Sequence, residues 1–367
     1  MRRILHCVER MDLGGLETMI MNLYRSIDKD EIQFDFLTLS SKEGYYDREI
    51  AELGGNIYRM QTTRKSWLKN KRELNNFFIN TNYKVIHFHV SSLSNMSPLV
   101  SAKHNGINIR IMHVHSMGIL SKNKMFHKVM HYKNFNQLKK ITTLRFACSK
   151  SAGDWAYSKN GKHSLDYTII KNSIDSKKYK FDQVKRQEVR AKLGIKDELV
   201  IGHIGRFHPV KNHKFLIDTF FEIKKTEKNA KLLLIGDGIL KKQLEEQVRE
   251  LKLTDDVLFL GLTDDVASYL QAIDLVLFPS IFEGLGLSLI EAQAASVPCL
   301  ISDSIPEDVI ITHYVKVLSL HEDISLWSAE AINLFRQTNR VDRMNKIVTS
   351  GYDSKRNSEI MKNYYLN

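Results

Sequence analysis

The fold is decided by the stretch "FPSIFEGLGLSLIEAQAASVP", residues 278–298. An apolar run ends near Pro279, and apolar residues recur at helical spacing from Leu287 or Ser288 onward. The glycines between these two patterns permit an irregular turn. The stretch therefore predicts a strand, a turn and a helix, which is the repeating unit of a parallel α/β sheet.

Two glutamates flank this turn. On one continuous helix the spacing from Glu283 to Glu291 would leave the two side chains about 80° apart, aimed at no common target. Gly284 and Gly286 favour instead a turn that holds Glu283 and a helix whose first turn holds Glu291. Because ligands bind at the C-terminal edge of an open parallel sheet, we expect both carboxylates to face a ligand there.

Short apolar runs alternate with longer helical patterns along the whole chain of 367 residues. This alternation is typical of doubly wound α/β domains, and the length favours two of them. We expect one Rossmann-like domain over 1–172 and a second over 173–349, facing each other across a cleft. The lysine-rich segment at 176–188 is the expected boundary, and a polar helical segment at about 350–367 is able to pack back on the first domain.

The expected strands are 4–8, 34–39, 56–60, 85–89, 109–115, 144–149 and 168–171 in the first domain, and 199–205, 231–235, 257–260, 275–278 and 299–301 in the second. The expected helices include 17–26, 125–140, 212–228, 239–251, 264–272 and 288–295.

Composition excludes several classes of protein. A hydrophobic fraction of 43% is enough for ordinary cores, so we expect neither a disordered nor a fibrous chain. The cysteines Cys7, Cys148 and Cys299 form no metal or redox motif, which indicates a reducing, cytoplasmic compartment. No apolar stretch reaches the roughly 18 residues of a membrane span, and no signal-peptide pattern opens the chain. We expect a soluble or peripheral protein.

The net charge of +12 calls for an anionic partner or for nothing beyond solubility. Residues 121–145 contain no Asp or Glu, and their basic residues alternate with apolar ones at helical spacing; residues 64–78 are similar. A basic amphipathic helix suggests contact with an anionic membrane surface, here the inner face of the cell membrane. The alternative is a core-packed helix with a solvated basic back. Nucleic acid is not expected, since no recognition motif supports it.

Two loops after expected strands carry groups that suit a diphosphate. In 12–18, Gly15 would let the backbone pass close to a ligand before a helix begins, although such glycines are also common in plain turns. In 202–216, Arg206 follows a strand directly and Lys211 precedes a helix. A forked donor and a point charge suit two phosphates, and the alternative is a pair of solvated surface cations.

The opening stretch supplies a third set of groups. Free backbone N–H groups of Leu287 and Ser288, at the start of the helix, form an anion site. Glu291 is able to accept two hydrogen bonds from a ribose diol, or merely to complement the helix dipole. Glu283 is placed to face a transferred group.

Two expected strands each carry a His-x-His pattern. His87 and His89 share one face of their strand, and His113 and His115 share one face of theirs. No carboxylate or cysteine completes either set locally, so we expect no metal site. His115, nearest the C-terminal end of its strand, is the better candidate for contact with a substrate.

Four segments together resemble a known family. They are "GGLE" (14–17), "GRFHPVKN" (205–212), "LLLIGDG" (232–238) and the stretch 259–303. They are similar to retaining glycosyltransferases of the GT-B class, and more narrowly to the family 4, or group 1, enzymes of bacterial capsule and exopolysaccharide synthesis. The resemblance covers most of the chain and is strongest over 200–303.

The resemblance implies a nucleotide-sugar donor, most often UDP-linked, held mainly by the second domain without a metal or other cofactor. Arg206 and Lys211 would neutralise the leaving diphosphate, and Glu283 would contact the sugar. Glu291 would bind the ribose hydroxyls. The remaining implied contacts are the backbone around Gly261 and Leu262 at the base, Leu287 and Ser288 at a phosphate, Gly15 at the diphosphate and His115 at the sugar.

The implied chemistry follows from charge. Cleavage of the anomeric bond builds negative charge on the diphosphate, and preorganised cations lower that barrier without a metal. Retention with no evident enzymic nucleophile fits front-face attack, in which the departing phosphate oxygen takes the proton of a saccharide acceptor, expected to be lipid-linked. The one Asp-x-Asp pattern, at 28–30, lies at a polar helix end and is interpreted as a solvated turn.

Ser173 and Ser296 stand where the family usually has glycine, and neither change removes a charged group. Two other functions stay open: a nucleotide-sugar epimerase on the same architecture, and a non-catalytic nucleotide-binding scaffold subunit. No matching set of extra catalytic carboxylates and histidines supports the epimerase. The intact set of Arg206, Lys211, Glu283 and Glu291 argues against the scaffold.

Overall fold

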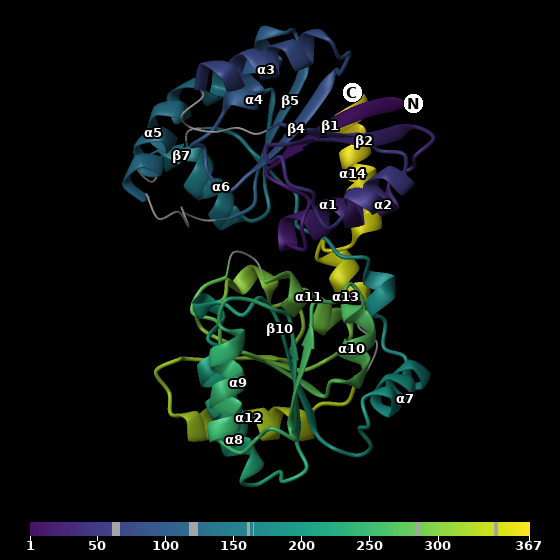
Figure 1. Cartoon of the computed structure of the whole chain (residues 1–367), viewed down its shortest axis with the longest axis vertical. Helices are drawn as coiled ribbons and strands as arrows, with labels where there is room; N and C mark the ends of the chain where they lie inside the picture. Colours follow the sequence, from purple (N-terminus) through teal and green to yellow (C-terminus); the bar gives the residue numbers. More distant parts are fainter. Residues whose placement is uncertain (61–66, 117–123, 160–161, 164, 284–285, 341–343) are drawn as a thin grey trace. The chain divides into compact units, whose positions relative to one another are not determined.

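The chain forms two compact units in the computed structural model, which describes residues 1–60, 67–116, 124–159, 162–163, 165–283, 286–340 and 344–367 (Figure 1). The first unit comprises Met1–Ser173 and Ser354–Asn367, and the second comprises Ile174–Asp353. Each unit is built on one parallel sheet with helices on both faces, which confirms the expected class of two Rossmann-like α/β domains.

The first sheet has seven strands in the order β3-β2-β1-β4-β5-β6-β9, all parallel. These strands are β1 (Arg2–Val8), β2 (Ile32–Thr38), β3 (Ile57–Arg59), β4 (Val85–Val90), β5 (Ile109–Val114), β6 (Leu144–Ala147) and β9 (Thr168–Ile169). The helices are α1 (Gly15–Ser26), α2 (Asp47–Glu52), α3 (Trp67–Ile79), α4 (Ser97–His104), α5 (Lys124–Ile141), α6 (Lys150–Tyr157) and α14 (Ser354–Leu366). A short antiparallel pair, β7 (Ser158–Lys159) and β8 (Lys162–His163), stands apart from the sheet.

The two faces of the first sheet differ in chemistry. Residues of α3, α4, α5 and α6 pack with alternate strand residues such as Leu5, Ile86 and Met112 in one apolar cluster. On the opposite face lie α1 and α14, which pack against each other. Figure 1 shows α14 beside α1 in this unit. The last turn of α14 buries Tyr365 against the ring of Phe34, so this turn is part of the unit's core.

The second sheet has six parallel strands in the order β12-β11-β10-β13-β14-β15. These are β10 (Val200–Ile204), β11 (Lys231–Ile235), β12 (Val257–Gly261), β13 (Leu275–Phe278), β14 (Cys299–Ser302) and β15 (Val315–Leu318). Its helices are α7 (Gln183–Lys192), α8 (His213–Lys224), α9 (Lys241–Glu250), α10 (Val266–Ala272), α11 (Leu287–Ala294), α12 (Ile324–Gln337) and α13 (Met344–Thr349), with 3-10 turns η2 (Ser176–Tyr179), η3 (Pro209–Lys211) and η4 (Glu307–Val309).

Each sheet contains a point where the strand order reverses. In the first sheet the reversal lies between β1 and β4, and in the second it lies between β10 and β13. Loops that leave two neighbouring strands in opposite directions part at such a point and leave a crevice at the C-terminal edge. The topology therefore marks one candidate ligand-binding edge in each unit.

The segment 176–188, the expected boundary, begins just after the division of the two units at Ser173 and Ile174, and it is ordered secondary structure. It forms η2 and the first part of α7, because Asp182 caps the helix by accepting hydrogen bonds from the N–H groups of Val184 and Lys185. The helix α12 and the edge strand β15 were not anticipated at all.

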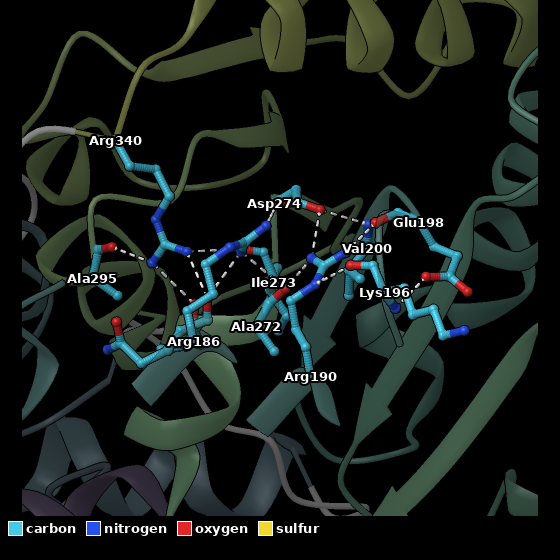
Figure 2. A network of polar contacts seen from close by, with 12 residues as sticks. Arg186, Arg190, Lys196, Glu198, Val200, Ala272, Ile273, Asp274, Ala295 and Arg340 are labelled. Atoms are coloured by element: carbon cyan, nitrogen blue, oxygen red, sulfur yellow. Dashed lines mark hydrogen bonds and ion pairs between the residues drawn. The ribbon is translucent and has the colours of Figure 1, made fainter. Parts of the chain in front are cut away.

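A network of arginines holds the N-terminal edge of the second sheet together (Figure 2). Arg186 and Arg190, both on α7, bind the carboxylate of Asp274 at 2.5 and 3.2 Å. Together with Arg340, they also donate to main-chain carbonyls at the C-terminal end of α10. Basic side chains at a helix C-terminus complement its dipole, so this network stabilises the edge opposite the candidate site.

Among the described residues, no helix combines the length and the apolar character that a membrane crossing requires.

Candidate functional site

The candidate site of the second unit lies at the reversal between β10 and β13. The loop after β10 carries Arg206 and then η3, which ends at Lys211. The loop after β13 carries Glu283, and the N–H of Ile281 donates to the carbonyl of Val210 at 2.8 Å. This bond ties the two loops together, so the basic and acidic groups predicted from the sequence meet at the edge where a ligand is expected.

Lys211 and Glu283 form an ion pair at the centre of this edge. Lys211 Nζ lies 2.5 Å from Glu283 Oε1, and the two side chains are only 17% and 7% exposed. The hydroxyl of Ser280 donates to the same carboxylate oxygen at 2.7 Å. The ammonium of Lys211 also lies 5.1 Å from the centre of the Phe278 ring. A ligand that takes Lys211 must therefore compete with an acidic partner already in place.

Glycines allow the loops under Lys211 to pack closely. A Cβ on Gly236, whose φ is +147°, would lie 2.0 Å from the carbonyl oxygen of Gly205. A Cβ on Gly205 would lie 3.1 Å from His203 Nε2 and 3.4 Å from Lys211 Cε. The glycine at 236 therefore lets the loops that follow β10 and β11 pack against each other.

Arg206 has a different environment from Lys211, although both follow β10. Its side chain is exposed, and within the described parts of the chain it has no ion-pair or hydrogen-bond partner. An exposed guanidinium is able to turn toward a ligand without breaking an existing contact. Of the two predicted cations, Lys211 is therefore already paired with a carboxylate, and Arg206 is not.

Glu291 lies in the second turn of α11, not in the first turn as expected, because the helix begins at Leu287. The carboxylate is buried, and the phenol of Tyr179 donates to its Oε1 at 2.8 Å. Burial raises the pKa of Glu291 to about 7, and the hydrogen bond from Tyr179 opposes part of that rise. In the parts of the chain that the structure describes, its Oε2 has no hydrogen-bond partner and is able to accept a bond from a ligand.

The start of α11 and the end of β12 offer backbone groups. Gly286 precedes α11 in the left-handed region at φ +71°, and Leu287 and Ser288 are its first two residues, whose N–H groups have no partner within the helix. Gly261 is also left-handed, at φ +73°, and no atom lies within 4 Å of where its Cβ would stand. Leu262 beside it is 64% exposed. Gly284, predicted to lie in the turn, is outside the described residues.

In the first unit, the structure gives two predicted residues clear positions. Gly15 is exposed and begins α1 directly after the loop that follows β1. His115 follows β5 and is 8% exposed; its Nδ1 lies 3.0 Å from Asn172 Oδ1 and its Nε2 lies 2.9 Å from His89 Nδ1. Burial lowers the pKa of His115 to about 4, so the imidazole is neutral at pH 7.

Comparison with known proteins decides the family. Residues 185–350 match the family model described as glycosyl transferases group 1. Over 99% of its length the chain is 34% identical to the putative glycosyltransferase EpsF of Bacillus subtilis (strain 168), of which it covers 96%. The chain belongs to the group 1 glycosyltransferases.

Two further similarities bear on this glycosyltransferase. Over 60% of its chain it is 25% identical to UDP-Gal:alpha-D-GlcNAc-diphosphoundecaprenol alpha-1,3-galactosyltransferase of Escherichia coli, and it covers 58% of that protein. Its structure is similar to the crystal structure of HepE from Anabaena in complex with UDP, with a TM-score of 0.79, 17% identity and 99% of both chains covered. The fold of the glycosyltransferase is GT-B, as the sequence resemblance implied.

The two departures from the family's glycines have different consequences in this glycosyltransferase. Ser296 has a φ of +58° directly after α11, and its N–H and that of Val297 close a Schellman motif onto Gln293 and Ala292. That backbone conformation favours glycine, which explains the usual residue there. Ser173 is buried, and its carbonyl accepts a hydrogen bond from Asn22 at 3.2 Å.

Sequence reasoning missed three residues that the structure brings to the predicted groups. Ser280 donates to Glu283, Tyr179 donates to Glu291, and Asn172 contacts His115. Ser280 stands three positions before Glu283, which local inspection could have noted. Tyr179 is separated from its partner by 112 positions, and no local pattern connects the two.

Proposed function

We propose that this glycosyltransferase transfers a sugar from a UDP-sugar to a lipid-linked saccharide, with retention at the anomeric carbon, in the synthesis of a capsular, exopolysaccharide or related cell-surface glycan. The observation that carries the proposal is the Lys211–Glu283 ion pair at the reversal point of the second sheet. The UDP complex of HepE supports a UDP-linked donor, and the named donor and diphosphoundecaprenol acceptor of the Escherichia coli relative support both substrates.

In this proposal the donor replaces Glu283 as the partner of Lys211. A diphosphate carries more negative charge than one carboxylate and accepts bonds from both Lys211 and the unengaged Arg206. Release from Lys211 leaves the Glu283 carboxylate to accept hydrogen bonds from sugar hydroxyls. The ion pair therefore acts as a placeholder that keeps Lys211 oriented before the donor binds.

The rest of the donor is bound by groups around this pair. Glu291 accepts hydrogen bonds from the ribose diol through the oxygen that Tyr179 leaves available. The N–H groups of Leu287 and Ser288 bind a phosphate oxygen, as free groups at a helix start do. The remaining proposed contacts are Gly261 and Leu262 at the base, Gly15 at the diphosphate and His115 at the sugar.

Charge stabilisation is the main source of catalysis in this proposal. As the anomeric carbon–oxygen bond breaks, electrons move to the leaving phosphate oxygen, where Lys211 and Arg206 stabilise the charge without a metal at that site. The acceptor hydroxyl attacks from the same face, and its proton passes to the departing phosphate oxygen. After that release the hydroxyl of Ser280 still donates to Glu283 Oε1, which suits hydrogen bonding to the sugar and not attack on its carbon.

The helix α5 supports contact with a membrane that carries the acceptor. Among the described side chains of this helix, His131, Phe135, Leu138 and Ile141 are buried, yet Met125 and Val129 remain 76% and 58% exposed. Exposed lysines lie among them at 128, 133, 139 and 140. Lysines beside exposed apolar side chains favour peripheral binding to an anionic bilayer, which we place at the cytoplasmic face of the cell membrane. The predicted segment 121–123 lies outside the described residues.

The test is release of UDP from a panel of UDP-sugars, with and without detergent extracts of polyprenyl-diphosphate saccharides. The proposal expects release that depends on both one UDP-sugar and a lipid-linked acceptor, with a product of retained configuration by NMR. Release of UDP that no acceptor stimulates, or conversion of the donor into an epimer, would contradict it.

A further inference from the structure

Five histidines line one face of the first sheet. Strand residues such as Cys7, Phe88 and Met112 belong to the apolar cluster on the side of α3 to α6, and the histidines occupy positions that alternate with them. The five are His6, His87, His89, His113 and His115, and none is more than 8% exposed. Buried imidazoles are costly unless their ring nitrogens are hydrogen-bonded, so the bonds of this layer need to be accounted for ring by ring.

Burial keeps every ring of this layer neutral. It lowers the pKa of His6 to about 3 and that of His115 to about 4. It also lowers the pKa values of His87, His89 and His113 well below the usual value, and neighbouring imidazoles lower them further. Each ring therefore has one N–H group and one lone pair at pH 7.

Three of the five rings form one continuous hydrogen-bonded series, which we call the imidazole series. His6 Nδ1 lies 2.9 Å from His89 Nε2, and His89 Nδ1 lies 2.9 Å from His115 Nε2. At the outer end, His115 Nδ1 lies 3.0 Å from Asn172 Oδ1. At the inner end, His6 Nε2 has no hydrogen-bond partner among the described residues. Only the outer end is therefore fixed by a group other than an imidazole.

That outer end sets the direction of every bond in the imidazole series. A carboxamide oxygen only accepts, so His115 Nδ1 carries the proton that binds Asn172. His115 Nε2 is then a lone pair, which accepts a bond from the N–H at His89 Nδ1. His89 Nε2 accepts in turn from His6 Nδ1. Because each neutral ring has a single N–H, the oxygen of Asn172 selects one tautomer for all three rings.

The two remaining rings belong to a separate series. The phenol of Tyr365 lies 2.7 Å from His87 Nδ1, and His87 Nε2 lies 3.2 Å from His113 Nδ1. His113 is also hydrogen-bonded to the backbone of Ile170. Within the described parts of the chain, no hydrogen bond joins His87 to the imidazole series, although it lies on the same strand as His89 and is as deeply buried. His87 is therefore a matched control for His89.

We propose that His6 and His89 are positioning residues that hold His115 as the tautomer protonated on Nδ1, and that His115 then contacts the donor sugar without giving or taking a proton. The inference rests on the proposed contact between His115 and the sugar. It assigns that contact to carbon atoms of the ring, because both nitrogens are already bonded. C–H groups of this kind form weak hydrogen bonds with oxygen. His115 is the most exposed of the three rings, which suits contact with a ligand.

This arrangement determines where the proton of the acceptor goes. For His115 to take that proton, its Nε2 would have to release the N–H of His89, and a charged imidazolium would then be buried. The proton therefore passes to the departing phosphate oxygen, and His115 has the same number of protons before and after transfer. A neutral ring also suits the donor sugar, because its anomeric carbon gains positive charge as the bond breaks and an imidazolium would repel that charge.

The test is the tautomer of His115 in the full-length protein labelled with ¹⁵N-histidine. Two-bond ¹H–¹⁵N correlation spectra distinguish protonated from unprotonated ring nitrogens, and the spectrum of His115→Gln assigns the signal by its loss. We expect Nδ1 to be protonated and Nε2 to be unprotonated, with no change between about pH 6 and pH 8, since the pKa of His115 is about 4.

Variants of His89 separate positioning from packing. His89→Phe keeps a ring of similar volume but removes the N–H that binds His115 Nε2, so His115 should lose its single tautomer. The value of kcat should then fall by roughly tenfold, because the ring is no longer held in place. His89→Asn places an amide N–H near the position of Nδ1 and should restore both the tautomer and kcat. The matched control His87→Phe should leave the tautomer of His115 unchanged.

Asn172→Leu removes the accepting oxygen and is the second variant if His89→Phe is poorly folded by circular dichroism; it should also abolish the single tautomer. Protonation of His115 on Nε2 in the wild-type protein would overturn the proposal, as would a tautomer that survives in every folded variant of the pair. Failure of the proposed function is read separately, because UDP affinity is measured by calorimetry and is assigned to the second unit. A protein that binds no UDP but keeps the Nδ1 tautomer would contradict the proposed function and not the positioning of His115.

Discussion

The phenol of Tyr179 donates a hydrogen bond of 2.8 Å to the buried carboxylate of Glu291, across 112 positions of sequence. Tyr179 lies in η2, the first ordered element of the second unit, and Glu291 lies in the helix that follows the reversal-point strand β13. The contact therefore links the first ordered element of the second unit to Glu291, the residue proposed to bind the ribose. It also determines how the charge of that carboxylate depends on its surroundings.

Glu291 should make stability depend on pH. Burial raises its pKa to about 7 from an ordinary value of 4.5, so the folded state binds more protons than the unfolded state between these values. The free energy of unfolding should fall as pH rises through this window, by roughly 3 kcal/mol in total from this group. Glu291→Gln should remove that fall in urea titrations at pH 4.5 to 8. Tyr179→Phe should raise the pKa of Glu291 further, so that the fall in the free energy of unfolding continues to higher pH. Parallel curves of unfolding free energy against pH for wild type and Glu291→Gln would refute the assignment.

Variants of Arg206 and Lys211 should show different effects on activity and on stability. Arg206→Ala should reduce kcat by at least a hundredfold with unfolding unchanged within about 0.5 kcal/mol, since the side chain is exposed. Lys211→Ala should also lose turnover, but it leaves the buried carboxylate of Glu283 unpaired and should destabilise the fold by about 2–3 kcal/mol.

The matched control is the double variant Lys211→Met/Glu283→Gln. It should recover most of the stability that Lys211→Ala loses, while turnover stays low. Recovery of activity together with stability would show that Lys211 acts only as a structural ion pair. Measurements are urea unfolding and initial rates of UDP release.

Ser296→Gly should stabilise the glycosyltransferase. The backbone at 296 is left-handed, which costs a serine about 1 kcal/mol relative to glycine, and its buried hydroxyl has no hydrogen-bond partner among the described residues. We expect the free energy of unfolding to rise by about 1 kcal/mol in the glycine variant. Ser296→Ala removes the hydroxyl and keeps the backbone strain, so it should gain less; an equal gain would assign the effect to the hydroxyl.

Exposed apolar residues on α5 should control membrane binding. Val129→Glu and Met125→Glu should each weaken binding to vesicles of phosphatidylglycerol by roughly tenfold. Each of these exposed side chains would contribute about 1.5 kcal/mol when it is buried in the bilayer. Ile239→Glu, at an equally exposed position of the second unit, is the control. Equal binding of all three variants in vesicle flotation would place the membrane contact elsewhere.

Much of the fold could be predicted because buried parallel strands appear as contiguous apolar runs. β11 and β13 were predicted with the bounds that the structure has, and α11 begins at Leu287 as the glycine-rich turn indicated. The segment 176–188 was expected only as a polar boundary, and the capped helix that begins within it, whose arginines bind Asp274, was not predicted. Local polarity carries no sign of such a distant partner.

The sequence allowed the residues of the candidate site to be predicted, but not which of them contact one another. Lys211 and Glu283 were expected to act on different parts of one ligand, and the structure shows that they bind each other first. The contact between His89 and His115 depends on the register between β4 and β5, which brings two local patterns together and which no single-strand pattern contains. Contacts that depend on register and on long-range packing require the folded chain.

The measurement that tests the central claim most directly is calorimetric titration of the purified protein with UDP, GDP, ADP and UMP in the presence of EDTA. The proposed site predicts selective binding of UDP, with UMP clearly weaker, because Lys211 and Arg206 bind the second phosphate without a metal at that site. Absence of UDP binding in EDTA, or affinity for UDP no greater than for UMP, would contradict it.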